Sequence, residues 1–158
     1  MYSELDGTER AGNCLSTLAG IFFGTGWWFF VDGVAYSRFQ AEQGEDVVLV
    51  DAKQYLPGFG VTIALVMVCG MDWGAINADD FSYSGSNVAT KARCFLGLGV
   101  VIAMASIVGA IVIIVEEYDD KCPDDAGVSC LWPGIAILLQ TIFISLATFF
   151  LRCSLPIE

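Results

Sequence analysis

Four long apolar segments, each close to the length of a membrane-spanning helix, constrain the fold more than any other feature of the sequence. They cover residues 14–36, 56–76, 94–115 and 133–151. A helix needs about 20 apolar residues to cross the hydrocarbon core of a bilayer. Apolar side chains fill every face of each segment, which is typical of helices surrounded by lipid and by one another. The pattern predicts an all-α integral membrane protein with four transmembrane helices.

The composition supports the same class of protein. Hydrophobic residues make up 56% of the 158 residues and charged residues only 16%, whereas a soluble domain carries about 25% charged residues. A soluble chain of this length has too little interior to bury so much apolar surface. The linkers between segments are short, so neighbouring helices should be antiparallel. We expect a single membrane domain over residues 1–158, folded as a four-helix bundle with both termini on the same side.

Charge and the absence of histidine exclude several function classes. Seven Lys and Arg residues against 18 Asp and Glu residues give a net charge of −11, and nucleic-acid-binding proteins need a basic surface. Without any histidine, the chain lacks the usual general base and the usual ligands of zinc and haem. We therefore expect no nucleic-acid partner, no cofactor, no metal site and no enzymatic activity.

The two sides of the predicted bundle differ by one basic residue, which indicates how the bundle is oriented in the membrane. The side with the termini holds four of them and the opposite side three, namely Arg10, Lys91, Arg93 and Arg152 against Arg38, Lys53 and Lys121. Cytoplasmic loops carry an excess of Lys and Arg. The count favours cytoplasmic termini.

Two of the six cysteines share the predicted loop before the fourth segment. Cys122 and Cys130 would face a lumen in this orientation, where a disulfide can persist. Seven residues separate them, a spacing that permits a disulfide and is equally compatible with two free thiols.

The other cysteines fall within or at the ends of the segments. Cys14, Cys94 and Cys153 lie at the predicted cytoplasmic helix ends, where cysteines are candidates for palmitoylation. The simpler interpretation is three small apolar residues. Cys69 falls inside the second segment, and we expect it to pack between helices.

Asp32 and Gln140 are the polar residues of greatest interest within the predicted spans. Counted from the outer ends of their segments, they lie roughly 8 Å and 10 Å deep, so they share a level and could form a hydrogen-bonded pair. An intramembrane carboxylate is a functional hypothesis by default, although we prefer a structural role. No second acid and no basic counter-ion lies at that level, which disfavours a proton or ion relay.

Small residues and two tryptophans are expected at helix contacts. The set is Gly20, Gly24, Gly26, Trp27, Trp28, Gly70, Gly74 and Gly109. Glycines four residues apart allow two helices to approach closely, but they do not say whether the second helix belongs to the same chain. Trp prefers the membrane interface, so the central position of Trp27 and Trp28 predicts packing inside the bundle or contact with another subunit or lipid. Trp73 and Trp132 are expected as interfacial anchors.

Two motifs carry a family resemblance. Residues 25–32 read Thr-Gly-Trp-Trp-x-x-x-Asp and residues 133–140 read Pro-Gly-Ile-Ala-x-x-x-Gln, with Ala92 and Arg93 ahead of the third segment. In these features the chain resembles the transmembrane protein 50 family, whose yeast relative is a vacuolar protein sorting protein.

The resemblance implies a four-span protein of endosomal and secretory membranes with cytoplasmic termini. The family that the chain resembles has no established enzymatic activity or cofactor. Its yeast relative works with a small four-span membrane protein, so the resemblance implies a similar partner here. Asp32 and Gln140 belong to the two motifs, so the resemblance adds weight to a shared role for them.

The first functional hypothesis is a non-catalytic membrane adaptor or accessory subunit in endosomal or vacuolar protein trafficking. It would act through helix–helix association in a hetero-oligomeric complex, with membrane lipids and other integral membrane proteins as its partners. The alternative is a small structural subunit of a large respiratory, photosynthetic or ATPase complex. A transporter or channel ranks third, because one Asp and one Gln provide little polar path through the bundle.

Overall fold

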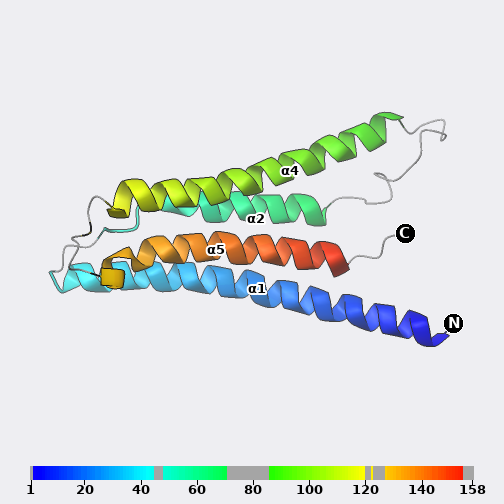
Figure 1. The fold of residues 1–158 in the computed structure, drawn as a ribbon, viewed down its shortest axis with the longest axis horizontal. Coiled ribbons are helices and arrows are strands. Elements are labelled where there is room, and N and C mark those ends of the chain that lie inside the picture. Colours follow the sequence, from blue (N-terminus) through cyan, green and yellow to red (C-terminus); the bar gives the residue numbers. More distant parts are fainter. Residues whose placement is uncertain (1, 45–47, 71–85, 120–121, 123–126, 155–158) are drawn as a thin grey trace.

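The computed structural model describes residues 2–44, 48–70, 86–119, 122 and 127–154. These residues contain four helices long and apolar enough to cross a membrane, and no strand occurs among them. Their described ends, Tyr2 and Ser154, lie at the same end of the bundle (Figure 1). The predicted fold class, an all-α membrane four-helix bundle with both termini on one side, is confirmed.

The described residues form four α-helices and two short helical turns. The helices are α1 (Tyr2–Glu42), α2 (Leu56–Cys69), α4 (Ser86–Ile113) and α5 (Gly127–Ser154). A 3-10 turn, η1 (Ala52–Tyr55), leads into α2, and a π-helical turn, η2 (Ile114–Asp119), ends α4. Three of the α-helices are longer than the predicted segments, because a helix continues into flanking polar residues that can be solvated by water or lipid headgroups.

Pro133 shows why one predicted helix start is wrong. The fourth apolar segment begins at Pro133, which predicts a helix start there, because the missing N–H of a proline costs little in a first helical turn. In the structure α5 begins at Gly127, so Pro133 lies inside the helix, where it is buried. Neighbouring helices make such an internal proline tolerable in a membrane. Asp72, Trp73 and Gly74 lie outside the described residues.

The helices pack as two antiparallel pairs. α1 runs along α5, and α4 runs along α2, while α2 and α5 join the pairs in the middle (Figure 1). Toward the end that carries Tyr2 and Ser154, α1 and α4 spread apart. As a result α1 is covered chiefly on the side that faces α5.

Aromatic rings fill much of the space between helices. Phe22 of α1 lies 5.4 Å from Phe143 and 5.1 Å from Phe150, measured between ring centroids. Phe30 lies 4.7 Å from Tyr55 in an edge-to-face arrangement. Such tilted and edge-on pairs are the favourable geometries for aromatic rings, and they fix α1 against α5 and the start of α2.

Candidate functional site

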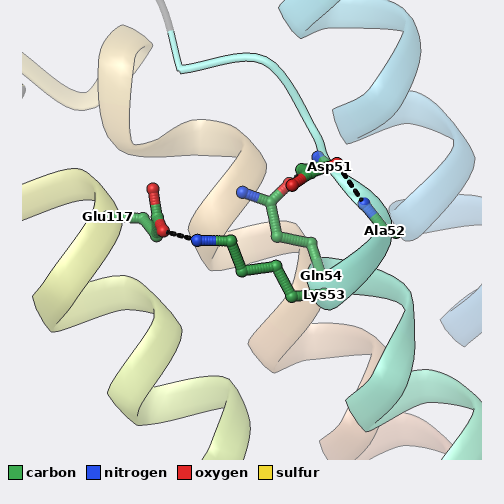
Figure 2. Close-up of polar contacts among 5 residues, drawn as sticks. All are labelled: Asp51, Ala52, Lys53, Gln54 and Glu117. Carbon is green, nitrogen blue, oxygen red and sulfur yellow. Dashed lines mark hydrogen bonds and ion pairs between the residues drawn. The ribbon is translucent and has the colours of Figure 1, made fainter.

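We term the end of the bundle opposite Tyr2 and Ser154 the outer end. A capped turn at this end leads into α2. The backbone N–H of Ala52 donates to Asp51 Oδ1 at 2.7 Å, and the N–H of Asp51 donates to Gln54 Oε1 at 2.8 Å (Figure 2). The Asp51 side chain also accepts from the backbone N–H of Gln54, so Asp51 and Gln54 form a capping box, which satisfies backbone donors at a helix start. The turn buries Gln54 and directs Lys53 toward η2.

Lys53 forms an ion pair that joins the start of α2 to the end of α4. Its Nζ donates to Glu117 Oε1, a contact drawn in Figure 2. Because half of the Lys53 side chain is exposed, the pair contributes little stability on its own. The contact shows that the start of α2 and the end of η2 lie next to each other.

The π-helical turn η2 places Tyr118 against α5. A Cβ added at Gly134 would lie only 3.0 Å from Tyr118 Cδ2, so the ring needs a glycine beneath it. Within the described part of the chain, the buried Tyr118 hydroxyl has no hydrogen-bond partner. Just beyond η2, Cys122 and Cys130 form a disulfide with their Cα atoms 5.8 Å apart. The disulfide ties the chain after η2 to the first turns of α5.

Asp32 has a different partner from the one that its depth suggested. Trp132 Nε1 donates to Asp32 Oδ2 at 2.9 Å, which bridges α1 and α5 near the outer end. The expected bond to Gln140 is absent from the described contacts, because the helix register places Gly26, not Asp32, beside the Gln140 carbonyl. Asp32 lies six residues from Gly26, which is about 9 Å along the helix.

Gln140 lies instead in the centre of the bundle. Its side chain is fully buried, and neither polar atom of its amide has a hydrogen-bond partner among the residues that the structure describes. The amide lies against Gly58 of α2, where an added Cβ would be 2.5 Å from Nε2 and 2.6 Å from Oε1. Gly58 therefore makes the space that Gln140 occupies, and the two residues couple α2 to α5.

Two glycines of α1 set the close approach to α5. A Cβ at Gly33 would lie 2.7 Å from Ala136 Cβ, and a Cβ at Gly26 would lie 3.2 Å from the Gln140 carbonyl oxygen. Real Cβ atoms do not occur as close as the 2.7 Å found at Gly33. The 3.2 Å found at Gly26 is tighter than almost all real Cβ contacts. Gly26 is one of the predicted packing residues, whereas the sequence reasoning missed Gly33. The seven-residue spacing between them was the available signal, because residues seven apart lie on the same helix face.

Most of the other predicted packing glycines do not contact a second helix. No described atom outside their own helical surroundings lies within 4 Å of a Cβ built at Gly20, Gly24 or Gly109. The nearest such atom to Gly70 is the Val66 carbonyl of its own helix end. These four residues make no contact with a second helix of the described structure, and the small-residue pattern leaves open whether their partner helix belongs to another protein.

Trp27 and Trp28 lie on different sides of α1, one facing the bundle and one exposed. Trp27 is half-buried and lies 5.7 Å from Phe59 of α2, ring centroid to ring centroid. Trp28 is 73% exposed and points away from the bundle. Together with Gly20, Gly24 and Val31, it forms what we term the open face of α1, whose members are three or four residues apart and all exposed.

A comparison with known proteins identifies the family. The chain matches the Uncharacterised protein family (UPF0220) over residues 2–158. The chain belongs to this family. One relative, the Transmembrane protein 50 homolog of Dictyostelium discoideum, is 33% identical over 87% of this chain and 86% of its own length.

Two fungal relatives extend the comparison. Vacuolar protein sorting-associated protein 68 of Saccharomyces cerevisiae is 24% identical over 82% of this chain and 78% of its own length. A UPF0220 protein of Schizosaccharomyces pombe is 27% identical over 63% of this chain and 57% of its own length. No solved structure matches the chain. The resemblance to the transmembrane protein 50 family is confirmed, and none of these names refers to an enzyme.

In this UPF0220 member, the two motifs of the resemblance meet along the α1–α5 contact. Gly26 and Asp32 of the first motif contact the α5 residues around Gln140 and Trp132. Ala136 of the second motif lies against Gly33. The motifs therefore mark a helix pair, with Trp28 on the opposite, uncovered side of α1.

Proposed function

We propose that this multi-pass membrane protein is a non-catalytic adaptor in endosomal or vacuolar protein sorting. One relative is named as a vacuolar protein sorting-associated protein, and the names of the others carry no activity. An adaptor needs a surface that another membrane protein can cover. The open face of α1 is the observation that carries the proposal.

The open face has the chemistry of a helix-docking surface. Gly20 and Gly24 are one helical turn apart, and no other helix of the described structure lies against them. Inside a bilayer, such glycines allow a second helix to approach the backbone closely, which supplies van der Waals contact. Trp28, one turn further along, adds a large ring to that contact. The proposed occupant is a transmembrane helix of another integral membrane protein.

The opposite side of α1 explains why the open face is available. Gly26 and Gly33 hold that side tightly on α5, so α1 is positioned by its inner face alone. A partner can therefore dock on the outer face without disturbing the bundle. Asp32 then serves to fix α1 on α5 through Trp132, which is the structural role expected for it.

Complementation of cells that lack the protein tests this function. Gly24→Leu should reduce delivery of a vacuolar or lysosomal cargo to the level of the null cells, because the new side chain blocks close approach of a partner helix. Gly97→Leu is the matched control, since Gly97 is an exposed glycine of α4 with equally open surroundings. It should restore delivery as the unmodified chain does.

Both variants must be present at normal levels in the membrane for the comparison to hold. If Gly24→Leu restores cargo delivery fully, the open face is not used in sorting. If the unmodified protein co-purifies in fixed stoichiometry with a respiratory, photosynthetic or ATPase complex, the sorting function itself is wrong.

A further inference from the structure

The six cysteines are divided between the two ends of the bundle, and all of them belong to the described residues. Cys122 and Cys130 are joined at the outer end. Cys14, Cys69, Cys94 and Cys153 are free, exposed and placed one on each helix. The exposure of Cys69 corrects the expectation that it packs between helices, since α2 ends at this residue. We term these four residues the thiol ring.

Contacts between helices place the thiol ring at one level. A Cβ at Gly12 would lie 3.1 Å from the Ser154 carbonyl, so Cys14 and Cys153 are near neighbours along the axis. Gly58 lies beside Gln140, and from there α2 and α5 run in the same direction to Cys69 and Cys153. Cys69 follows Gly58 by 11 positions and Cys153 follows Gln140 by 13. The two cysteines therefore differ in height by two residues, or about 3 Å along the helix axis.

The fourth member of the ring lies on α4 at a similar height. A Cβ at Gly99 would lie 3.6 Å from Met67 Cβ. Cys69 follows Met67 by two residues, and Cys94 precedes Gly99 by five on the antiparallel helix. All four sulfur-bearing residues therefore fall within about 5 Å along the axis, which is less than one helical turn.

That level coincides with a boundary of the hydrocarbon core. Cys153 follows Trp132 by 21 positions on α5, which is about 31 Å of helix. The hydrocarbon core is about 30 Å thick, and Trp132 has the interfacial character that marks its outer boundary. The thiol ring thus lies at the inner boundary, next to acyl chains on one side and water on the other.

The division of the cysteines also gives the two ends of the bundle their compartments. Disulfides persist in oxidising lumenal or extracellular spaces, whereas cytosolic thiols are kept reduced. A paired outer end and a free inner end therefore place the thiol ring on the cytosolic side. Arg93 and Arg152 directly precede Cys94 and Cys153, which agrees with the excess of basic residues on the cytosolic side.

We propose that the thiol ring is a site of S-acylation by long-chain acyl groups. The cysteine sulfur attacks the carbonyl carbon of a long-chain acyl-coenzyme A and forms a new thioester. The bond from that carbon to the coenzyme A sulfur breaks, and coenzyme A leaves with the cysteine proton.

Other uses of these thiols fit the structure less well. No three Cys, Asp or Glu side chains come together within the described ranges in a way that could hold a metal ion. The four thiols point outward from four different helices, so an acyl chain on any of them enters the bilayer directly. Acylation needs no pocket in the protein.

Acyl exchange on the full-length chain, expressed in eukaryotic cells, tests the proposal. Free thiols are blocked with N-ethylmaleimide, thioesters are cleaved with neutral hydroxylamine, and the released thiols are coupled to maleimide-polyethylene glycol. The unmodified chain should give four hydroxylamine-dependent mass steps, one for each cysteine of the ring. Each of Cys14→Ser, Cys69→Ser, Cys94→Ser and Cys153→Ser should remove one occupied step, and the variant with all four changes should give none.

The disulfide provides the internal control. Cys122 and Cys130 become reactive only after reduction, so an unchanged reduction-dependent signal shows that a variant has kept its fold. If the variant with all four cysteines replaced loses that signal, it has not folded, and the four single variants then provide the test. The proposal is overturned if the unmodified chain gives no hydroxylamine-dependent step, or if the steps persist when all four cysteines of the ring are replaced.

Discussion

Gly33→Ala will destabilise the bundle by about 1–3 kcal/mol, the usual cost of forcing extra atoms into a packed contact. The added Cβ would lie 2.7 Å from Ala136 Cβ and 3.4 Å from Pro133 Cα. Neither atom can rotate away, because both are held close to the α5 backbone. Relief therefore requires α1 to move off α5, which stretches the Trp132–Asp32 hydrogen bond. The free energy of unfolding in mixed detergent micelles measures the effect.

Two further variants assign the loss to this one contact. Gly24→Ala makes the same chemical change on the open face of the same helix, where the space is empty, and it should not lower the stability. Ala136→Gly combined with Gly33→Ala removes the opposing methyl group and should recover most of the loss. Equal stabilities for Gly33→Ala and Gly24→Ala would show that α1 and α5 do not meet as described.

Gln140→Met will raise the free energy of unfolding by about 1–3 kcal/mol, the cost of a buried polar group without a hydrogen bond. Methionine has a similar length and removes the amide whose polar atoms have no partner in the described structure. Its flexible side chain can occupy the space that Gly58 leaves. Thermal unfolding in detergent compares it with the parent chain.

Thr141→Val is the matched control for this change. Thr141 is the buried neighbour of Gln140, but its hydroxyl donates to the Leu138 carbonyl at 2.8 Å. Removal of a satisfied hydroxyl should give no gain in stability. A lower melting temperature for Gln140→Met would mean that the amide is bonded in the folded protein, and the description of its surroundings would then be wrong.

The sequence was sufficient for the fold because the length of an apolar segment directly reflects the thickness of a bilayer. It was insufficient for helix ends, since nothing in the apolar pattern shows that α1 continues to Glu42 or that α5 begins before Pro133. Those ends depend on local caps and on packing against the neighbouring helix.

The error over Asp32 has a similar physical origin. Depth was counted from the ends of apolar segments, which placed Asp32 level with Gln140. The actual register is set by how closely Gly33 allows α1 to approach Ala136, and that contact brings Trp132 to Asp32 instead. A single sequence contains the glycines that fix a register but not the identity of the residues opposite them.

The glycine patterns were ambiguous in the same way. Gly20 and Gly24 have the spacing of a helix contact, yet Gly26 and Gly33 make the contact with α5. A pattern on one helix reports close approach without naming the partner. The pair that is unused within the chain is the pair that we assign to another protein.

Photo-crosslinking from the open face tests whether another membrane protein docks on α1. A benzoylphenylalanine replaces exposed Trp28 of α1 in one sample and exposed Phe95 of α4 in the other, and native membranes are irradiated before purification. The expected result is a discrete adduct between position 28 and a second integral membrane protein, with no such adduct from position 95. Adducts with lipid alone at position 28, or the same protein adduct from both positions, would contradict it.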